Sequence, residues 1–208
     1  MTAYLSVDGP LDQPQVVWAA EHFSILFKPP GMAVQPDARG DLDLATWYQA
    51  DCAVVGRLDR PVSGLVLVAT TAEGRTRLQT AQSERKLTKI YRARLSAGAP
   101  RLPARLEHGW RFERGLAHAT PLGAPRTKPM RTQVLEQTTA WVELQLITGR
   151  RHQLRVQLAA HGCPILGDRR YGGVRSDRVH LASVGIGLPG LPVYRLDEAT
   201  LTRLGLAG

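Results

Sequence analysis

The chain has 208 residues, of which 43% are hydrophobic and 22% are charged, a balance that is typical of a globular protein and excludes a disordered or fibrous one. No stretch of eighteen apolar residues occurs, and the first ten residues lack a signal-peptide pattern, so we predict neither a membrane span nor secretion. The formal net charge of +9 suits a polyanionic partner, because basic side chains release the counterions condensed on phosphates.

The cysteine and histidine positions do not match known metal or redox motifs. Cys52 and Cys163 lie far apart and form neither a CxxC pair nor a disulfide framework, so we expect a reducing, cytoplasmic location. His152 and His161 are not spaced as in HExxH, and the chain has no Walker A or complete GxGxxG segment. We therefore expect no metal and no nucleotide cofactor.

The expected secondary structure alternates short strands with short helices. The longest apolar run, Leu65–Ala69, predicts a buried strand, and Thr71 is a residue type that caps helices. Gly162 suits the glycine that often follows a helix. In chain order, the expected elements are strands at 16–20 and 23–27 that form a hairpin, a helix at 42–50, a buried strand at 65–71, a helix that begins after Thr71 and ends near Glu84, a half-buried strand at 89–95, a strand at 142–146 and a helix at 152–161.

The pattern of these elements predicts an α+β fold. Residues 97–130 are rich in Gly, Pro and Arg, and we expect mainly loops there. Because strands outnumber helices and hairpin-like spacing recurs, we predict a mixed, mainly antiparallel sheet flanked by short helices. We assign residues 1–208 to a single domain, since the length fits one large domain.

The segment 56–64, with the sequence GRLDRPVSG, is the first candidate for chemistry. Asp59 stands between Arg57 and Arg60 at the entry to a buried strand, which is a rigid place to hold a reacting group. A guanidinium close to the carboxylate would keep it ionised and therefore nucleophilic. The alternative is a surface ion pair in a turn, which is common and contributes little.

Two later segments carry an aromatic residue and a group of arginines. Tyr91, in the segment 89–93 (KIYRA), is either a core aromatic or a phenol that faces a cavity, where it could stack on a base or transfer a proton. In the segment 148–155 (TGRRHQLR), a helical conformation would put Arg151 and Arg155 one turn apart on one face. These arginines either bind anions or form a solvated helix face.

Taken in this order, the segments resemble the RluA-type pseudouridine synthases over nearly the whole chain. The most specific match is RLDRPVSGLVLVA at 57–69, against the catalytic motif RLDxxTSGLLLxA. Three positions depart from the family pattern: Gly56, Val62 and Gln157. The further matches are ILFKPPGMAVQP at 25–36 with NKPxGxxVHP, KIYRA at 89–93 with KxYxA, TGRRHQLRVQLAAHGCPILGDRRYG at 148–172 with TGRxHQIRVHLxxxGxPIxGDxxYG, and HLA at 180–182 with LHA.

The resemblance implies a reaction and a role for three residues. It implies the pseudouridine-synthase fold with a central basic cleft, which isomerises uridine in RNA to pseudouridine without cofactor or metal. The motif aspartate, Asp59, would be the nucleophile on a uridine that has left the base stack. It would attack either ribose C1′, by a route that is generally thought to pass through a glycal, or the base itself. Tyr91 would stack on the base and take the C2′ proton, and Arg155 would pair with Asp59.

The resemblance and the basic charge together predict an RNA partner, either transfer RNA or ribosomal RNA. Arg57 would occupy the space that the uridine leaves in the stack. We expect a monomer without an S4-type RNA-binding domain ahead of the catalytic region. The alternatives are a non-catalytic RNA-binding or assembly protein that retains the fold, and another enzyme with an aspartate nucleophile, such as a hydrolase. The predicted RNA-binding residues are Arg57, Arg60, Arg150, Arg151, His152, Gln153, Lys28 and Lys128.

Overall fold

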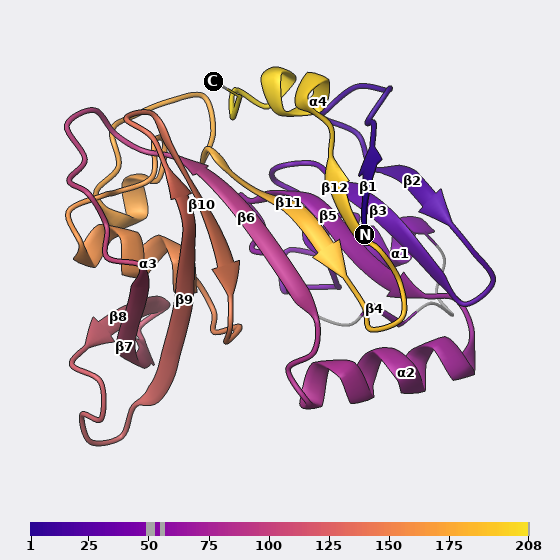
Figure 1. Ribbon diagram of the computed structural model, residues 1–208, viewed down its shortest axis with the longest axis horizontal. Coiled ribbons are helices and arrows are strands. Elements are labelled where there is room, and N and C mark those ends of the chain that lie inside the picture. The colour runs from indigo at the N-terminus through magenta and orange to yellow at the C-terminus, as the bar shows by residue number, and fades with distance from the viewer. Residues whose placement is uncertain (49–52, 55–56, 208) are drawn as a thin grey trace. The chain divides into compact units, whose positions relative to one another are not determined.

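The computed structural model describes residues 1–48, 53–54 and 57–207 (Figure 1). The last two residues of the helix expected at 42–50, together with Cys52 and Gly56, lie outside these described residues. The chain divides into two compact units, one made of Met1–Lys89 and Ala182–Ala207 and the other of Ile90–Leu181. The assignment of a single catalytic domain stays a prediction, and each unit is described by itself.

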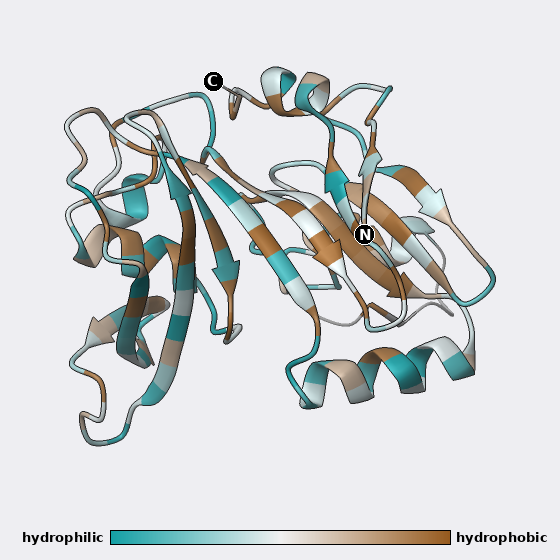
Figure 2. Ribbon diagram, in the orientation of Figure 1, coloured by the Kyte–Doolittle hydropathy of each residue, from teal (hydrophilic) through white to brown (hydrophobic). Residues whose placement is uncertain are grey.

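The first unit is built around two fully buried strands, β3 (Phe23–Lys28) and β5 (Ser63–Ala69). Both strands appear almost continuously brown in Figure 2, as expected for strands that are covered on both faces. β2 (Gln15–Ala19) pairs antiparallel with β3, and β3 pairs antiparallel with β5 along its whole length. These pairings confirm the predicted hairpin and the predicted buried strand.

Four further strands complete the sheet of the first unit. β11 (Leu181–Gly187) runs parallel to the start of β5, whereas β4 (Ala53–Val54) pairs antiparallel with its end. β12 (Val193–Leu196) pairs antiparallel with β11, and β1 (Thr2–Leu5) pairs parallel with β12. The pairing with β11 leaves no room for a side chain at Gly64, where an added Cβ would lie 2.2 Å from the carbonyl oxygen of Ser183.

Three short helices belong to the first unit, α1 (Leu44–Tyr48), α2 (Ala72–Ser83) and α4 (Glu198–Arg203). The hydroxyl of Thr71 accepts a hydrogen bond from the amide of Gly74 at 3.1 Å, which confirms the predicted cap of α2. Each helix is shorter than four turns, and within the described ranges no helix has the length and hydropathy that a membrane crossing requires.

The second unit is an antiparallel sheet in the order β6-β10-β9-β7-β8. Its helix α3 packs against β7 and β8, and an apolar cluster of Ala117, Met130 and Val156 fills the space on this side of the sheet. The elements of the unit are β6 (Thr88–Arg94), which begins in the first unit, β7 (Arg105–Glu113), β8 (Leu116–Thr120), β9 (Lys128–Gln137), β10 (Trp141–Leu146), α3 (Gln153–Ala160) and the single 3-10 turn Arg169–Tyr171.

Two expectations for the second unit were wrong. Residues 97–130 are not mainly loop, because they contain β7, β8 and the start of β9. Their charged side chains alternate outward, and Glu107 pairs across the strands with Arg131 at 3.1 Å. The strand β6 is buried on both faces at its centre, since Arg92 is enclosed with Glu143 at 3.0 Å and lies over the ring of Trp141.

The predicted α+β class with short helices is confirmed. Apart from the parallel pairs β5–β11 and β1–β12, the strand pairs described above are antiparallel. α3 lies within the predicted range 152–161, and Gly162 follows it with a φ of +70°, as predicted for a glycine that ends a helix.

Replacing Gly64 should disrupt the start of β5. Gly64 has a φ of +115°, so Gly64→Ala adds left-handed backbone strain to the clash with Ser183. We expect a loss of about 3 kcal/mol in the free energy of unfolding, measured by urea denaturation. Gly149→Ala is the control, because an added Cβ there meets nothing within 4 Å. Equal urea midpoints for the two variants would contradict this account of the β5–β11 pairing.

Candidate active site

The turn that carries Asp59 is held by its own backbone and by the loop before it. The amide of Val62 donates to the carbonyl of Asp59 at 2.9 Å, which closes the turn directly before β5. The next carbonyl, that of Arg60, accepts from the amide of Gly31 at 2.8 Å and from Lys28 Nζ at 3.2 Å. Asp59 itself is half-buried. The backbone that follows the Asp59 side chain is therefore held in place.

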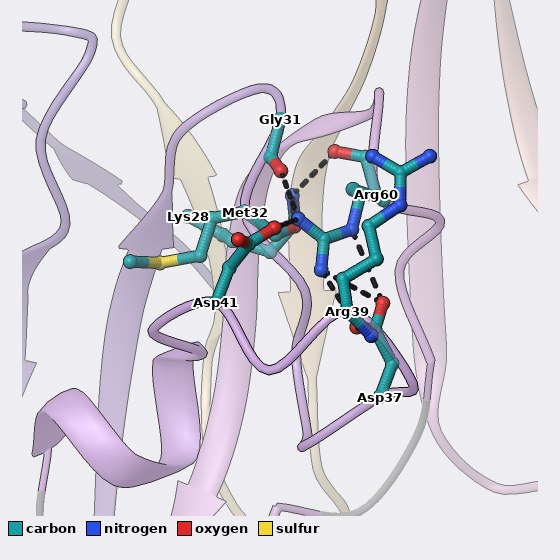
Figure 3. A network of polar contacts seen from close by, with 7 residues as sticks. All are labelled: Lys28, Gly31, Met32, Asp37, Arg39, Asp41 and Arg60. Carbon is teal, nitrogen blue, oxygen red and sulfur yellow. Dashed lines mark hydrogen bonds and ion pairs between the residues drawn. The ribbon is translucent and has the colours of Figure 1, made fainter.

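Lys28 is fully buried at the end of β3. Its ammonium group donates to the carbonyls of Pro29 and Met32, both at 2.8 Å, and to that of Arg60 (Figure 3). Burial lowers the pKa of Lys28 to about 7, and the nearby Asp59 carboxylate opposes this shift. Because the Lys28 ammonium donates to three backbone carbonyls, it supports the Asp59 turn. This buried, structural role does not suit the direct RNA contact expected for Lys28.

Arg60 points toward Asp37 and Asp41 of the preceding loop (Figure 3). Its guanidinium contacts Asp37 through Nε at 3.2 Å and Nη2 at 2.8 Å, and Asp41 through Nη1 at 2.8 Å. Nη1 also donates to the carbonyl of Gly31 at 3.0 Å. The hydrogen bonds from Arg60 lower the pKa of Asp37, and Asp37 in turn raises the pKa of Arg60. The predicted RNA contact Arg60 is thus engaged within the chain.

In the second unit, Arg155 forms a buried ion pair with Asp168. Arg155 Nε and Nη2 lie 2.6 and 2.8 Å from the two carboxylate oxygens, and the side chains are 4% and 1% exposed. The guanidinium also lies over the ring of Tyr171, 5.1 Å from its centroid. Such a two-point contact fixes the plane of the guanidinium as well as its charge.

The start of α3 differs from the expected helix. His152 adopts a left-handed conformation with φ +56°, so Arg151 lies before the helix and does not share a helix face with Arg155. Arg151 is exposed and lies over the ring of Phe112 at 4.6 Å, and its carbonyl accepts from Trp110 Nε1 at 3.1 Å. The left-handed residue lets the chain turn sharply, which separates an exposed arginine from a buried one.

The buried polar residues at this turn bind other parts of the second unit. Gln153 donates to the carbonyl of Arg131 and to Thr132, and its own carbonyl oxygen accepts from Thr148 at 2.9 Å. His152 Nδ1 lies 2.8 Å from the hydroxyl of Tyr171. Both His152 and Gln153 are buried, so they shape the segment before Arg155 and do not present a surface to RNA.

The remaining predicted residues differ in how far their side chains are exposed. Arg57 and Lys128 are exposed, and Arg150 is half-buried with Nε 3.3 Å from the carbonyl of Pro129. Tyr91 lies in β6 opposite Leu144 of β10 and is only 6% exposed. Asp59 belongs to the first unit, whereas Tyr91 and Arg155 belong to the second.

Sequence reasoning missed four residues that hold the predicted ones. Asp37 and Asp41 bind Arg60, while Asp168 and Tyr171 contact Arg155. Asp168 and Tyr171 stand at matching positions of the GDxxYG part of the resemblance, so that motif could have pointed to them. Asp37 and Asp41 carry no such signal. Among the described residues, no three His, Cys, Asp or Glu side chains gather closely enough to hold a metal ion.

Comparison with known proteins assigns the family. Residues 22–160 match the family model described as RNA pseudouridylate synthase, which is more than half of the chain. The chain belongs to this family. Asp59, Tyr91 and Arg155 all lie inside the matched range. The chain is similar in structure to human RNA Pseudouridylate Synthase Domain Containing 1, with a TM-score of 0.69 and 26% sequence identity. The match covers 88% of this chain and 81% of the human one.

Curated relatives carry related names. Ribosomal large subunit pseudouridine synthase D of Vibrio parahaemolyticus is 32% identical over 180 residues, which cover 80% of this chain and 54% of that protein. An uncharacterized RNA pseudouridine synthase of Chloroflexus aurantiacus is 34% identical over 170 residues, which cover 74% of this chain and 53% of that protein. This family member thus spans about half the length of the curated relatives it matches.

Replacing Asp168 should remove the two-point carboxylate contact of the buried Arg155. We expect Asp168→Asn to reduce the free energy of unfolding by about 3 kcal/mol in urea denaturation. Glu107→Gln is the control, since it breaks an ion pair with Arg131 in which both side chains are 43% exposed. That control should cost less than about 1 kcal/mol. Equal losses of unfolding free energy in the two variants would show that burial does not make the Arg155–Asp168 ion pair more stabilising than an exposed one.

Lys28 should make stability depend on pH. Its pKa falls from 10.5 to about 7 on folding, so the unfolded chain binds an extra proton between these values and stability rises with pH across that window. Relative to Lys28→Met, the wild type should gain about 2 kcal/mol of unfolding free energy from pH 7 to pH 9. Lys86→Met, at an exposed lysine, controls for the loss of one lysine. Parallel pH curves for wild type and Lys28→Met would contradict the assignment.

Proposed function

We propose that the protein is an RNA pseudouridine synthase that uses Asp59 as its nucleophile. The observation that carries the proposal is the location of Asp59, within the family match at 22–160 and in a backbone-fixed turn directly before the buried strand β5. A reacting carboxylate needs a rigid support, because small errors in its position cost rate. The half-buried setting of Asp59 is consistent with a group that meets a substrate.

The proposed reaction moves the uracil ring on its ribose. The bond between N1 and C1′ breaks, the ring turns, a bond forms between C5 and C1′, and the C5 hydrogen leaves to solvent. N1 gains a proton, so the atoms balance without an oxidant or reductant. In one route the Asp59 carboxylate attacks C1′ and leaves again when the bond between C5 and C1′ forms, and in the other it adds to the base and is released afterwards. In a glycal variant of the first route a base removes the C2′ proton, and a proton returns to C2′ as the bond between C5 and C1′ forms.

Tyr91 and Arg155 complete the proposed site. Tyr91 stacks on the extruded uracil and accepts the C2′ proton, and Arg155 pairs with Asp59. Support for Arg155 comes from its contact with Asp168, which already fixes Nε and Nη2 of the guanidinium. This proposal requires that Asp59, Tyr91 and Arg155 meet around one uridine in a basic cleft. Exposed Arg57, Arg151 and Lys128 and half-buried Arg150 are the RNA contacts that we retain.

The substrate is proposed to be ribosomal or transfer RNA. The names of the curated relatives favour ribosomal RNA, and the net charge of +9 supports a polyanionic substrate. We propose that the protein acts as a monomer in the cytoplasm. A non-catalytic RNA-binding protein of the same fold is the alternative, and it differs in having no need for the Asp59 carboxylate.

The test is pseudouridine formation by wild type and Asp59→Asn. We expect the variant to lose activity by at least roughly a thousandfold while it keeps its fold and binds RNA, because only the nucleophile is removed. Carbodiimide mapping of RNA from cells that lack the gene, incubated with each protein, measures this. Asp12→Asn, at an exposed aspartate, is the control and should stay active. Equal modification by Asp59→Asn and wild type would exclude the assignment, and no modification by wild type would favour the binding protein.

A further inference from the structure

Arg60, the residue after Asp59, is bound to one loop through both its main-chain carbonyl and its side-chain guanidinium. The carbonyl of Arg60 accepts from the amide of Gly31, and its guanidinium donates to the carbonyl of the same Gly31. The guanidinium then reaches further along the chain to Asp37 and Asp41, which close the loop around it (Figure 3). The loop 31–41 is thus attached to the Asp59 turn through main chain and side chain together.

The charges around Arg60 do not suit contact with a phosphate. Two carboxylates lie within 3.2 Å of the Arg60 guanidinium, so these three side chains together carry a net negative charge, to which the nearby exposed Arg39 adds a positive one. The Arg60 side chain is only 19% exposed, whereas Asp37 and Asp41 are 40% and 58% exposed. The donors of Arg60 are already bound by the two carboxylates, so a phosphate could reach this guanidinium only by displacing them, and like charges repel.

The loop itself is ordered around Asp37. Its carboxylate accepts from the amide of Arg39 at 3.0 Å, and its carbonyl accepts from the amide of Gly40 at 3.1 Å. One oxygen of Asp37 therefore holds both its own loop and the Arg60 guanidinium. A bidentate contact of this kind fixes orientation in a way that a lysine, which offers a point charge, cannot reproduce.

We propose that Arg60 is a positioning residue for Asp59, clamped by Asp37 and Asp41, and is not an RNA contact. The proposal rests on the proposed function, because it assigns Arg60 to the support of the reacting carboxylate. A fixed Arg60 fixes the peptide bond that follows Asp59 and hence the direction of the Asp59 side chain. Asp37 and Asp41 take part in this support without touching the substrate.

Arg60→Lys and the double variant Asp37→Asn/Asp41→Asn separate the two roles of Arg60. The double variant Asp8→Asn/Asp12→Asn removes the same charge from exposed positions outside this loop and is the matched control. The probe is total RNA labelled with tritium at uridine C5, taken from cells that lack the gene. Tritium released to solvent reports each turnover, and filter binding to the same RNA reports affinity and its dependence on salt.

A clamp and a phosphate contact predict different single-turnover rates. For a clamp, Arg60→Lys and Asp37→Asn/Asp41→Asn both lower the single-turnover rate at saturating protein by roughly tenfold to a hundredfold relative to the matched control. For a phosphate contact, removing the two carboxylates tightens RNA binding beyond the control, and Arg60→Lys keeps both affinity and rate. The second pattern would overturn the proposal. A lower stability with an unchanged single-turnover rate would also overturn it.

Amide hydrogen exchange makes the result independent of activity. Both clamp variants should speed exchange in peptides that cover Gly31 and Val62, because the Gly31 amide loses its fixed acceptor, the carbonyl of Arg60, and the turn closed by the Val62 amide loosens. The matched control should exchange as the wild type does. Unchanged exchange in the clamp variants would refute the clamp even if the wild type released no tritium. If the wild type released no tritium, the proposed function would fail, but the exchange data would still decide the role of Arg60.

Discussion

The carbonyl group of Arg60 is the acceptor on which the Asp59 turn depends. It receives the amide of Gly31 and the ammonium of Lys28, so it joins the loop after β3 to the turn before β5. β3 and β5 are themselves paired along their whole length in the core of the first unit. The carboxylate is therefore supported by the most buried part of this unit, and a hydrogen-bonded carbonyl transmits that rigidity to it.

Two buried cations are stabilised in different ways in this protein. Lys28 is surrounded by backbone carbonyls, and burial lowers its pKa, so its charge is costly near neutral pH. Arg155 keeps its charge at any physiological pH and is compensated by Asp168. The lysine suits a structural role close to a carboxylate. The arginine suits a site where a fixed positive charge must face a second anion, as the pairing proposed with Asp59 requires.

Local sequence patterns predicted the elements that are governed by local physics. The buried strand β5, the cap of α2 by Thr71 and the helix α3 were predicted because apolar runs, caps and helical spacing act over a few residues. The strands β7 and β8 were missed because the stretch 97–130 around them is rich in Gly, Pro and Arg, which hides the alternation of exposed residues with buried ones such as Leu106. Lys28, expected to contact RNA, is instead buried, because one of its hydrogen-bond acceptors, the carbonyl of Arg60, comes from a distant segment.

The sequence motifs predict a set of site residues but not the contacts that hold them. The motif around Asp59 and the family match agree on the reaction family. The clamp by Asp37 and Asp41 depends on a loop that returns to Arg60 over about twenty residues of sequence separation, a contact that no short pattern encodes. The burial of Lys28 and Gln153 likewise follows from tertiary hydrogen bonds, which propensity and charge do not report.

The most direct test is an experimental structure of Asp59→Asn, which can bind but not react, with a uridine-containing RNA substrate. We expect one uridine out of the base stack, with its C1′ facing the side chain at position 59. Tyr91 should lie against the uracil ring, and Arg155 should lie next to position 59 while still bound to Asp168. A bound uridine remote from position 59, or Tyr91 and Arg155 apart from it, would contradict the account.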